Sequence, residues 1–261
     1  MIFSHFKNLF WAVAISCGVG FGAKAVDNPS AADSPRVLVL NEGGGQHGPF
    51  TLRAMQWLDS VAAVKNFEII EMRDASRIDS TLLADIDLVV QLDYPPYTWP
   101  DAAVDAFEKY VDRGLGAWIG FHHATLLGEF DGYGLWKWFS DFMGSITFEN
   151  YIAPLADADV VVENGQHPVM GGVAGRFVVA DDEWYTYDRS PRPNVDVLAS
   201  VDESTYTPAS DIVMGDHPVV WTNPSKPAKN VYFQMGHSPK LLDNRDFTLM
   251  FENAIDWTLA K

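Results

Sequence analysis

Residues 117–124 read Ala-Trp-Ile-Gly-Phe-His-His-Ala, an apolar strand pattern that runs directly into two adjacent histidines. In an open α/β sheet, functional groups lie at the carboxyl ends of such strands. A strand that turns sharply into a helical pattern can also form a nucleophile elbow, but here His122 stands at the turn in place of serine or cysteine. We therefore predict a functional site at this turn that does not use covalent acyl chemistry. A half-buried, hydrogen-bonded histidine is the alternative interpretation of His122.

Apolar runs and helical patterns alternate along the chain on both sides of this stretch. The predicted strands of the first half are residues 37–40, 67–70, 88–92 and 117–121, and the predicted helices are 49–64, 101–113 and 135–142. Such alternation is typical of a mostly parallel sheet with helices on both faces. After Gly144 the pattern changes to strands at 160–163, 177–179, 195–200, 219–221 and 231–235, followed by a helix at 247–259. We predict one α/β domain over residues 36–261, with a loop- and strand-rich C-terminal half.

The first 25 residues have the composition of an export signal. An uncharged run over residues 8–22 leads to Ala23-Lys24-Ala25, which has the small-x-small pattern of a signal peptidase site. The run is too short and too rich in glycine to predict a membrane span. We therefore expect residues 1–25 to be a removed signal peptide, residues 26–35 to be a polar linker, and the mature protein to be periplasmic or extracellular. Cys17, the only cysteine, leaves a lipoprotein with its lipid anchor at Cys17 as the alternative.

Charge and cysteine content exclude several classes of partner and site. The chain has 35 acidic and 18 basic residues and a net charge of −17. This charge repels phosphate backbones and anionic lipid surfaces, so we expect no nucleic-acid partner. Removal of residues 1–25 would leave no cysteine, which excludes disulfides and thiolate zinc sites from the mature chain.

A glycine-rich turn follows the first predicted strand. Residues 43–48, Gly-Gly-Gly-Gln-His-Gly, match G-x-G-x-x-G, and Glu71 ends the next strand, as in a dinucleotide-binding fingerprint. However, Pro49 is best placed at the first helical position, which leaves Gly48 outside the helix as a cap instead of inside its first turn. We therefore expect no nucleotide, and we interpret the turn as one that presents His47 to the same sheet edge as His122.

Four further polar side chains follow or interrupt predicted strands, as His122 does, and they are His47, Glu183, His217 and His237. Imidazoles and a carboxylate that converge at one sheet edge can hold a divalent metal such as zinc with an open coordination position, or they can transfer protons without a metal. Their spacing is unlike a compact metal motif such as H-E-x-x-H. Surface histidines without a function are the alternative interpretation.

Five segments resemble the ThuA-like family, which is named for trehalose utilisation and is related in fold to class I glutamine amidotransferases. The segments are WIGFHHA at 118–124, DEWY at 182–185, VLASVDESTY at 197–206, DHPVVW at 216–221 and GH at 236–237. The resemblance implies a flavodoxin-like α/β fold in which His122 replaces the amidotransferase cysteine, so no glutamine amidotransferase activity is expected. It also implies that His47, His122, Glu183 and His237 occupy the family's characteristic polar positions, where some members look able to bind a metal.

The chain departs from the family pattern at two places. His123 stands where the family usually has alanine, and Gln46-His47-Gly48-Pro49 replaces the more usual histidine-aspartate-serine turn. These differences affect the set of metal ligands and the substrate that the resemblance implies.

Each candidate site residue receives an expected role. The predicted catalytic residues are His122 and Glu183, and the predicted metal ligands are His47, His122 and His237. The predicted substrate-binding residues are Trp184, Tyr185, His123 and His217, with Trp184 as the flat surface on which a sugar ring stacks. Asp181 and Asp182 precede Glu183, and their charges are expected to raise its proton affinity and to suit it to proton transfer. A solvent-exposed acidic loop is the alternative interpretation of these three residues.

These expectations combine into one predicted function and two alternatives. We expect an exported carbohydrate-active hydrolase or lyase that acts on keto-glycosides or trehalose-type sugars, with one divalent metal, zinc being the expected ion, or with histidine and glutamate alone. The expected partner is a small-molecule or oligosaccharide glycan. The first alternative is a non-catalytic sugar-binding module. The second is an NAD-dependent sugar oxidoreductase that uses the turn at residues 43–48.

Overall fold

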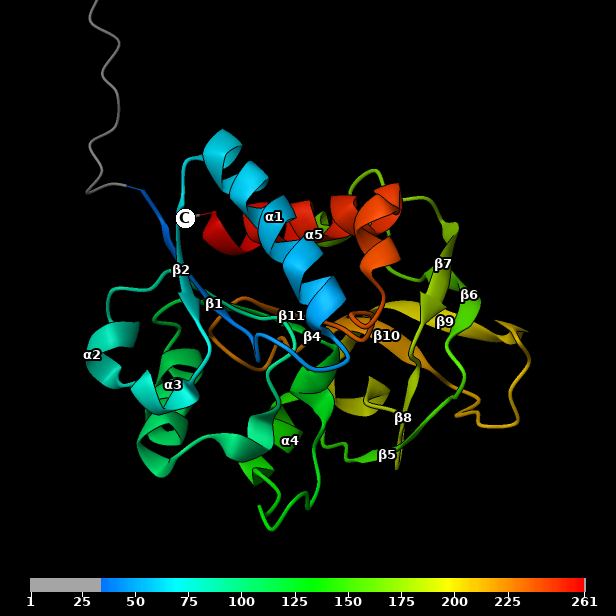
Figure 1. Cartoon of the computed structure of the whole chain (residues 1–261), viewed down its shortest axis with the longest axis horizontal. Coiled ribbons are helices and arrows are strands. Elements are labelled where there is room, and N and C mark those ends of the chain that lie inside the picture. The colour runs from blue at the N-terminus through cyan, green and yellow to red at the C-terminus, as the bar shows by residue number, and fades with distance from the viewer. Residues whose placement is uncertain (1–33, 261) are drawn as a thin grey trace, which may run out of the picture. The chain divides into compact units, whose positions relative to one another are not determined.

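The structure of the chain is a computed structural model that describes residues 34–260 (Figure 1). The predicted signal peptide, the lipid-anchor position Cys17 and most of the predicted linker lie outside the described residues. Among residues 34–260, no helix is long and apolar enough to cross a membrane.

The N-terminal half builds the parallel part of a nine-stranded sheet. Its strands lie side by side in the order β2 (Glu68–Met72), β1 (Arg36–Leu40), β3 (Leu88–Gln91) and β4 (Ala117–Phe121). β3 and β4 are buried along their whole length, and β1 is buried after its first residue. Burial on both faces explains why these strands have nearly continuous apolar sequences instead of alternating ones.

The C-terminal half adds one parallel strand and then an antiparallel extension. β11 (Asn230–Phe233) pairs in parallel with β4, with Ile119 opposite Val231. Beyond β11 the sheet continues through antiparallel pairs in the order β10 (Pro218–Thr222), β9 (Asp196–Thr207), β6 (Ala156–Val162) and β7 (Arg176–Asp182). β5 (Phe148–Tyr151) and β8 (Tyr185–Tyr187) form a separate two-stranded antiparallel ribbon. The sheet is therefore parallel in one half and antiparallel in the other.

Helices cover both faces of the sheet (Figure 1). α1 (Gly48–Lys65) and α5 (Arg245–Leu259) pack on one face, and α3 (Asp101–Asp112) and α4 (Lys137–Phe142) pack on the other, with α2 (Ser80–Leu83) beside α3. Phe251 of α5 and Phe107 of α3 have no exposed surface and belong to two separate apolar clusters, one on each face. The order of the parallel strands, β2-β1-β3-β4-β11, confirms the predicted flavodoxin-like α/β fold.

The structure differs from the predicted elements in a few places. The sequence patterns do not predict α2, β5 or β8, which are short, and β6, β7 and β9 are longer than predicted. α1 begins at Gly48, so the expectation that Gly48 lies outside the helix is wrong. Pro49 still lies in the first turn of α1, where its missing N–H is not needed for a helical hydrogen bond.

Candidate functional site

Four polar side chains from distant parts of the chain meet at the carboxyl edge of the parallel strands. His47 follows β1, His122 follows β4, His237 follows β11, and Glu183 lies in the short connection between β7 and β8. One possible ligand atom from each side chain lies within 4.8 Å of those of the other three. We call these residues the four-residue cluster. The prediction that His47 reaches the same edge as His122 is confirmed, with ring centroids 4.9 Å apart.

His122 occupies a sharp turn with a left-handed backbone conformation, at a φ of 39°. A non-glycine residue in this region is strained and persists only where its surroundings hold it. The carbonyl of His122 accepts hydrogen bonds from the hydroxyls of Thr125, at 3.1 Å, and Tyr232, at 3.0 Å. On the other side Gly236 packs closely, since a Cβ added there would lie 2.8 Å from the His122 Cβ. The turn is thus held from both sides, and it aims the imidazole into the cluster.

The imidazole of His122 has a defined tautomer. Its Nδ1 lies 2.9 Å from the carbonyl oxygen of Gln234, which can only accept, so Nδ1–H donates to Gln234. In the neutral ring, Nε2 then carries a lone pair that faces the Glu183 Oε2 at 3.1 Å. Two lone pairs at this distance repel each other unless a cation lies between them. The contact therefore suits a shared proton or a shared metal ion.

Two other nitrogen atoms of the cluster are buried without a hydrogen-bond partner among the described residues. They are Nε2 of His47 and Nδ1 of His237. The His237 Nδ1 lies 3.6 Å from the Glu183 Oε2, which is beyond hydrogen-bond distance. Buried polar atoms are normally paired, so unpaired ones at a site call for an explanation such as an ion. The donor set of three imidazoles and one carboxylate fits a divalent metal of the zinc, iron or nickel type.

Burial keeps two of these imidazoles neutral near pH 7. Burial and the neighbouring imidazoles lower the pKa of His47 to about 2. Burial lowers the pKa of His122 to about 4, although Glu183 opposes this shift. His237 differs, because the nearby carboxylates, chiefly Glu183, outweigh its burial and raise its pKa. Neutral imidazoles beside an ionised carboxylate are the protonation states that a metal ion requires of its ligands.

The surroundings of Glu183 correct the expectation that neighbouring aspartates raise its proton affinity. Burial alone would raise the pKa of Glu183, but the imidazoles of His122 and His237 hold it well below its usual range. Neither aspartate is its hydrogen-bond partner, because Asp182 faces the backbone of another loop and Asp181 pairs with a surface lysine. Glu183 is therefore a carboxylate at neutral pH, which suits it to binding a cation.

Asp182 joins the two loops that carry Glu183 and His237. Its fully buried carboxylate accepts hydrogen bonds from three consecutive backbone N–H groups, of Gly236 at 3.2 Å, His237 at 2.9 Å and Ser238 at 2.8 Å. Burial raises the pKa of Asp182 to about 6 even though these N–H groups favour the charged form. Asp182 thereby fixes the loop after β11 against the end of β7, so that Glu183 and His237 face each other.

A cavity of about 320 Å³ opens beside the cluster. It is lined by Glu42, Gln46, His47, His123, Leu126, Phe148, Tyr151, Glu183 and Tyr185. Phe148 and Tyr151, both on β5, are aromatic residues that no predicted element or motif contains, and Tyr151 is 44% exposed. The sequence feature that could identify these two residues is the segment Phe-Glu-Asn-Tyr, in which two aromatic residues flank two polar ones outside the predicted core strands.

Two of the predicted substrate-binding residues line this cavity. His123 is half-buried, and its Nδ1–H donates to the carbonyl of Asp93 at 2.7 Å, which leaves Nε2 free. Its ring lies 3.9 Å from that of His47, between centroids. Tyr185 is only 2% exposed, but it lines the cavity and stacks on His122 with centroids 4.1 Å apart.

The other two predicted substrate-binding residues lie elsewhere, and the structure corrects both expectations. Trp184 has no exposed surface, belongs to the apolar core and donates its indole N–H to the Ala156 carbonyl at 2.9 Å, so it offers no surface to a sugar. His217 is 2% exposed and lies behind Tyr185, 2.8 Å from its carbonyl oxygen, instead of facing the cavity. His217 therefore supports the backbone of the site from behind.

Glu203 holds His217 in this position. Its carboxylate lies 2.9 Å from the His217 Nδ1 and also accepts hydrogen bonds from the backbone N–H groups of Met214 and Gly215. Burial would raise the pKa of Glu203, but these hydrogen bonds lower it below its usual range. The ionised carboxylate is therefore part of the folded structure.

Glu203→Gln should lower the free energy of unfolding by about 1–3 kcal/mol near neutral pH, because the variant leaves buried donors poorly paired. Since the folded pKa lies below the unfolded value of about 4.5, this stabilisation is present above pH 4.5 and is lost as the pH falls through the folded pKa. Urea unfolding at a series of pH values should show the two proteins converging in acid. Glu149→Gln, at an exposed glutamate of β5, is the control and should match the wild type throughout. A constant difference across the acidic range would contradict the assignment.

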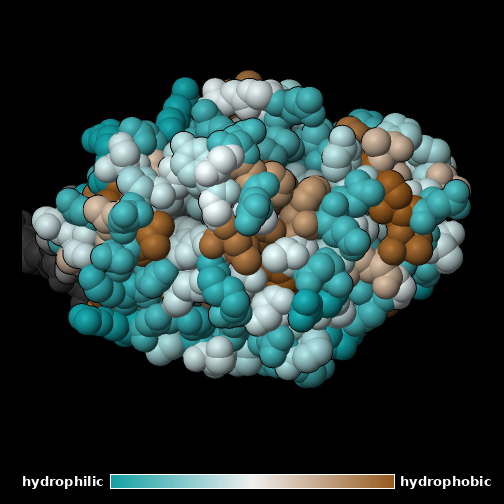
Figure 2. Space-filling view, turned by 90° about the horizontal axis from the view of Figure 1, so that it is seen from below, coloured by the Kyte–Doolittle hydropathy of each residue, from teal (hydrophilic) through white to brown (hydrophobic). Residues whose placement is uncertain are grey.

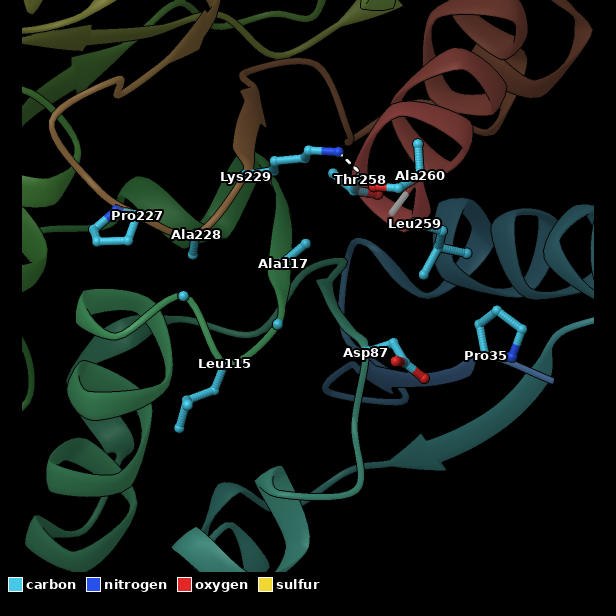
Figure 3. A pocket seen from close by; sticks show the side chains of 12 residues that line it. Pro35, Asp87, Leu115, Ala117, Pro227, Ala228, Lys229, Thr258, Leu259 and Ala260 are labelled. Carbon is cyan, nitrogen blue, oxygen red and sulfur yellow. Dashed lines mark hydrogen bonds between the residues drawn. The ribbon is translucent and has the colours of Figure 1, made fainter. Parts of the chain in front are cut away.

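A second cavity of about 320 Å³ lies at the opposite, amino edge of the strands (Figure 3). The charged side chains that line it are Asp87 and Lys229, and both are engaged. Asp87 accepts a hydrogen bond from the backbone N–H of Arg36 at 2.8 Å, and Lys229 donates to the carbonyls of Trp257 and Ala260 at the end of α5. Among the described residues, the charged groups that line this cavity are therefore occupied in holding the fold.

Comparison with known proteins identifies the family of the chain and two similar solved structures. The family model ThuA, described as trehalose utilisation, matches residues 36–258. A crystal structure of a protein described as ThuA-like from Bacteroides uniformis is 27% identical, with a TM-score of 0.77 over 93% of this chain and 96% of that chain. Another from Parabacteroides merdae is 18% identical, with a TM-score of 0.63 over 87% of this chain and 90% of that one. Among curated protein sequences, none is significantly similar to this chain.

Proposed function

The chain belongs to the ThuA family, the family of trehalose utilisation, and from this premise we propose that it is an exported enzyme that cleaves glycosidic bonds with the help of one divalent metal. The proposed substrates are keto-glycosides or trehalose-type sugars. The observation that carries the proposal is the four-residue cluster at the wall of an open cavity. Export rests on the sequence pattern of residues 1–25.

His47, His122, Glu183 and His237 would hold the metal. Their donor atoms lie within 4.8 Å of one another, and two of the imidazole nitrogens are buried without a partner among residues 34–260. A divalent ion bound there would act as a Lewis acid on a sugar oxygen. Glu183 enters this proposal as a ligand, because its low pKa makes it a weak proton acceptor.

His123 is the proposed proton acceptor. It lines the cavity, its Nδ1–H is fixed by the Asp93 carbonyl, and its Nε2 is free to face a substrate. In a 3-keto-glycoside the proton at C2 lies next to the carbonyl, and the glycosidic oxygen at C1 lies one carbon further. His123 Nε2 takes the C2 proton, the C1–O bond breaks to leave a C1=C2 double bond, and the departing oxygen takes the proton back from the imidazolium and leaves as an alcohol. Water then adds across the double bond, with its hydroxyl at C1 and its proton at C2, which completes a net hydrolysis. His122 at the elbow provides no thiolate, so the proposal includes no glutamine amidotransferase reaction.

Asp182→Asn tests how the two loops support the metal site. The variant should bind Zn²⁺ about 10–100-fold more weakly, because an amide NH₂ would face a backbone N–H and separate His237 from Glu183. Competition with a fluorescent chelator measures the affinity. Asp181→Asn, at the neighbouring residue that pairs with a surface lysine, is the matched control and should bind as the wild type does. Equal affinities of the two variants would show that the Asp182 contacts do not position the ligands.

The experiment that tests the proposed function combines elemental mass spectrometry with an assay on a chromogenic 3-keto-glucoside. We expect about one equivalent of a divalent metal and release of the chromophore that a chelator abolishes and the metal restores. Glu183→Gln should lose both metal and turnover. His167→Ala, at a half-buried histidine outside the cluster, is the control and should keep both.

Two results would contradict the proposed enzyme. Full turnover by metal-free protein would exclude the role of the metal. Absence of both metal and turnover, with retained binding of a glycan, would favour the non-catalytic sugar-binding module instead. In that case the histidines would act by hydrogen bonding alone.

A further inference from the structure

A series of aromatic side chains leads from the four-residue cluster to the surface. Phe148 meets Tyr185 edge-on, with ring centroids 5.0 Å apart. Phe130 lies 6.0 Å from Phe148, Tyr97 lies 5.1 Å from Phe130, and Tyr133 lies 6.0 Å from Tyr97. Tyr185 at the inner end is 2% exposed, the three rings between are half-buried, and Tyr133 at the outer end is 48% exposed. The rings therefore form a continuous path outward from the inner wall of the cavity.

A tight hairpin presents the outer part of this path. Phe130 and Tyr133 exchange two backbone hydrogen bonds, of 3.1 and 2.8 Å. Between them, Asp131 and Gly132 both have positive φ, of 52° and 85°. Two such residues form the two-residue turn that Asp-Gly favours in hairpins. The outer rings are thus held by a preformed turn, which lowers the entropic cost of binding a ligand there.

The surface around these rings combines aromatic and acidic groups. Tyr151 is likewise exposed, at 44%, and lines the adjoining cavity. Figure 2 views the molecule from the side of β5 and α4 and shows apolar side chains gathered near the middle of this face, with polar ones around them. Asp131 lies in the hairpin turn between Phe130 and Tyr133, and Glu42 lines the adjoining cavity, so both carboxylates belong to this surface. Exposed aromatic groups of this kind mark a binding surface.

The chemistry of this surface selects its ligand. Flat rings pack against the C–H faces of sugar rings, and carboxylates accept hydrogen bonds from sugar hydroxyls. The same carboxylates, in a chain of net charge −17, repel phosphorylated or otherwise anionic sugars. A neutral glycan satisfies both conditions.

We propose that Tyr97, Phe130 and Tyr133 form an outer subsite for a second sugar ring, so that the protein recognises neutral glycans of two or more residues. The proposal rests on the proposed function, in which the inner ring occupies the cavity beside the cluster. It extends that function by naming the length and charge of the substrate.

Titration calorimetry with defined glycans tests the outer subsite. The probes are methyl α-glucoside and methyl β-glucoside as single rings, and trehalose, maltose and cellobiose as double rings. At least one disaccharide should bind about tenfold more tightly than either monosaccharide. Tyr133→Ala should lose this tenfold gain and bind the single rings unchanged. Tyr133→Phe, which keeps the ring, should bind as the wild type does.

A control and three contrary outcomes complete the experiment. Leu115→Ala, at a side chain that is 57% exposed beside the cavity at the opposite edge, should leave all affinities unchanged. Equal affinities for single and double rings in the wild type, or an equal loss of both in Tyr133→Ala, would overturn the outer subsite. Absence of binding to every probe would also overturn it.

This result is separable from that of the proposed function, because calorimetry needs no turnover. A length preference that Tyr133→Ala removes, in a protein without metal or turnover, would keep the subsite and reject the enzyme. Metal and turnover without a preference for disaccharides would keep the enzyme and reject the subsite.

Discussion

His122→Ala should bind divalent metal roughly 100-fold or more weakly than the wild type and should lose turnover with it. His122 supplies one of the four donor atoms, and its Nε2 faces Glu183 at 3.1 Å with no competing hydrogen bond to a backbone group. Alanine removes the donor and also the ring that stacks on Tyr185. Removal of a ligand should weaken metal binding by more than the 10–100-fold that is usual when the lost group only orients a ligand. Elemental mass spectrometry after dialysis against a buffered metal solution measures the loss.

His167→Ala serves as the control for this variant. His167 is half-buried, its ring accepts a hydrogen bond from the Val169 N–H, and it meets the ring of Trp257 edge-on instead of any residue of the cluster. The His167→Ala variant should retain the full metal content of the wild type. A His122→Ala protein that also retains one equivalent of metal would remove His122 from the ligand set, and the contact between His122 and Glu183 would then be a shared proton.

Gly236→Ala should disrupt the site through its backbone. The added Cβ would lie 2.8 Å from the Cβ of His122 and 3.4 Å from that of Phe121. Both atoms are fixed to the end of β4, so they cannot move without displacing the strand and the strained turn. We expect a loss of about 1–3 kcal/mol in the free energy of unfolding and a decrease of about 10–100-fold in metal affinity. Urea unfolding and chelator competition measure the two effects.

Gly175→Ala is the matched control, because a Cβ at Gly175 would meet nothing within 4 Å. This variant should keep both the stability and the metal affinity of the wild type. Wild-type metal affinity in Gly236→Ala would show that the turn at His122 tolerates displacement. The close approach of Gly236 would then be a matter of packing alone.

Local sequence patterns predict most of the fold because the main strands are buried on both faces. β4 has an uninterrupted apolar sequence, and its predicted and observed ranges are both residues 117–121. β5 and β8 contain polar residues and form a partly exposed ribbon, so no periodic apolar signal marks them. β6 pairs with β9 across two intervening strands of the chain, and this pairing has no local signature in the sequence.

The residues of the site are predicted less completely because side-chain direction alternates along an extended chain. Glu183 and Tyr185 face the site, whereas Trp184 between them faces the core. The sequence identifies the segment Asp-Glu-Trp-Tyr but does not show which of its residues face outward. Trp184 and Tyr185 are both predicted to bind substrate, but only Tyr185 lines the cavity, where Phe148 and Tyr151 of β5 join it.

The protonation of Glu183 shows a second limit of sequence reasoning. The adjacent aspartates suggest a raised pKa, but the groups that determine it are His122 and His237, which lie more than fifty residues away along the chain. Only the pairing of β4 with β11 brings these two imidazoles to the same carboxylate.

The pairing of β4 with β11 also determines when the site can exist. Ile119 lies opposite Val231, so neither His122 nor His237 reaches its final place until both β4 and β11 have been synthesised. Non-local parallel pairing of this kind forms slowly. Metal uptake should therefore follow folding, and an ion that binds only the folded chain would stabilise the entire domain by mass action. Bound metal would then stabilise only those chains in which β4 and β11 have already paired correctly.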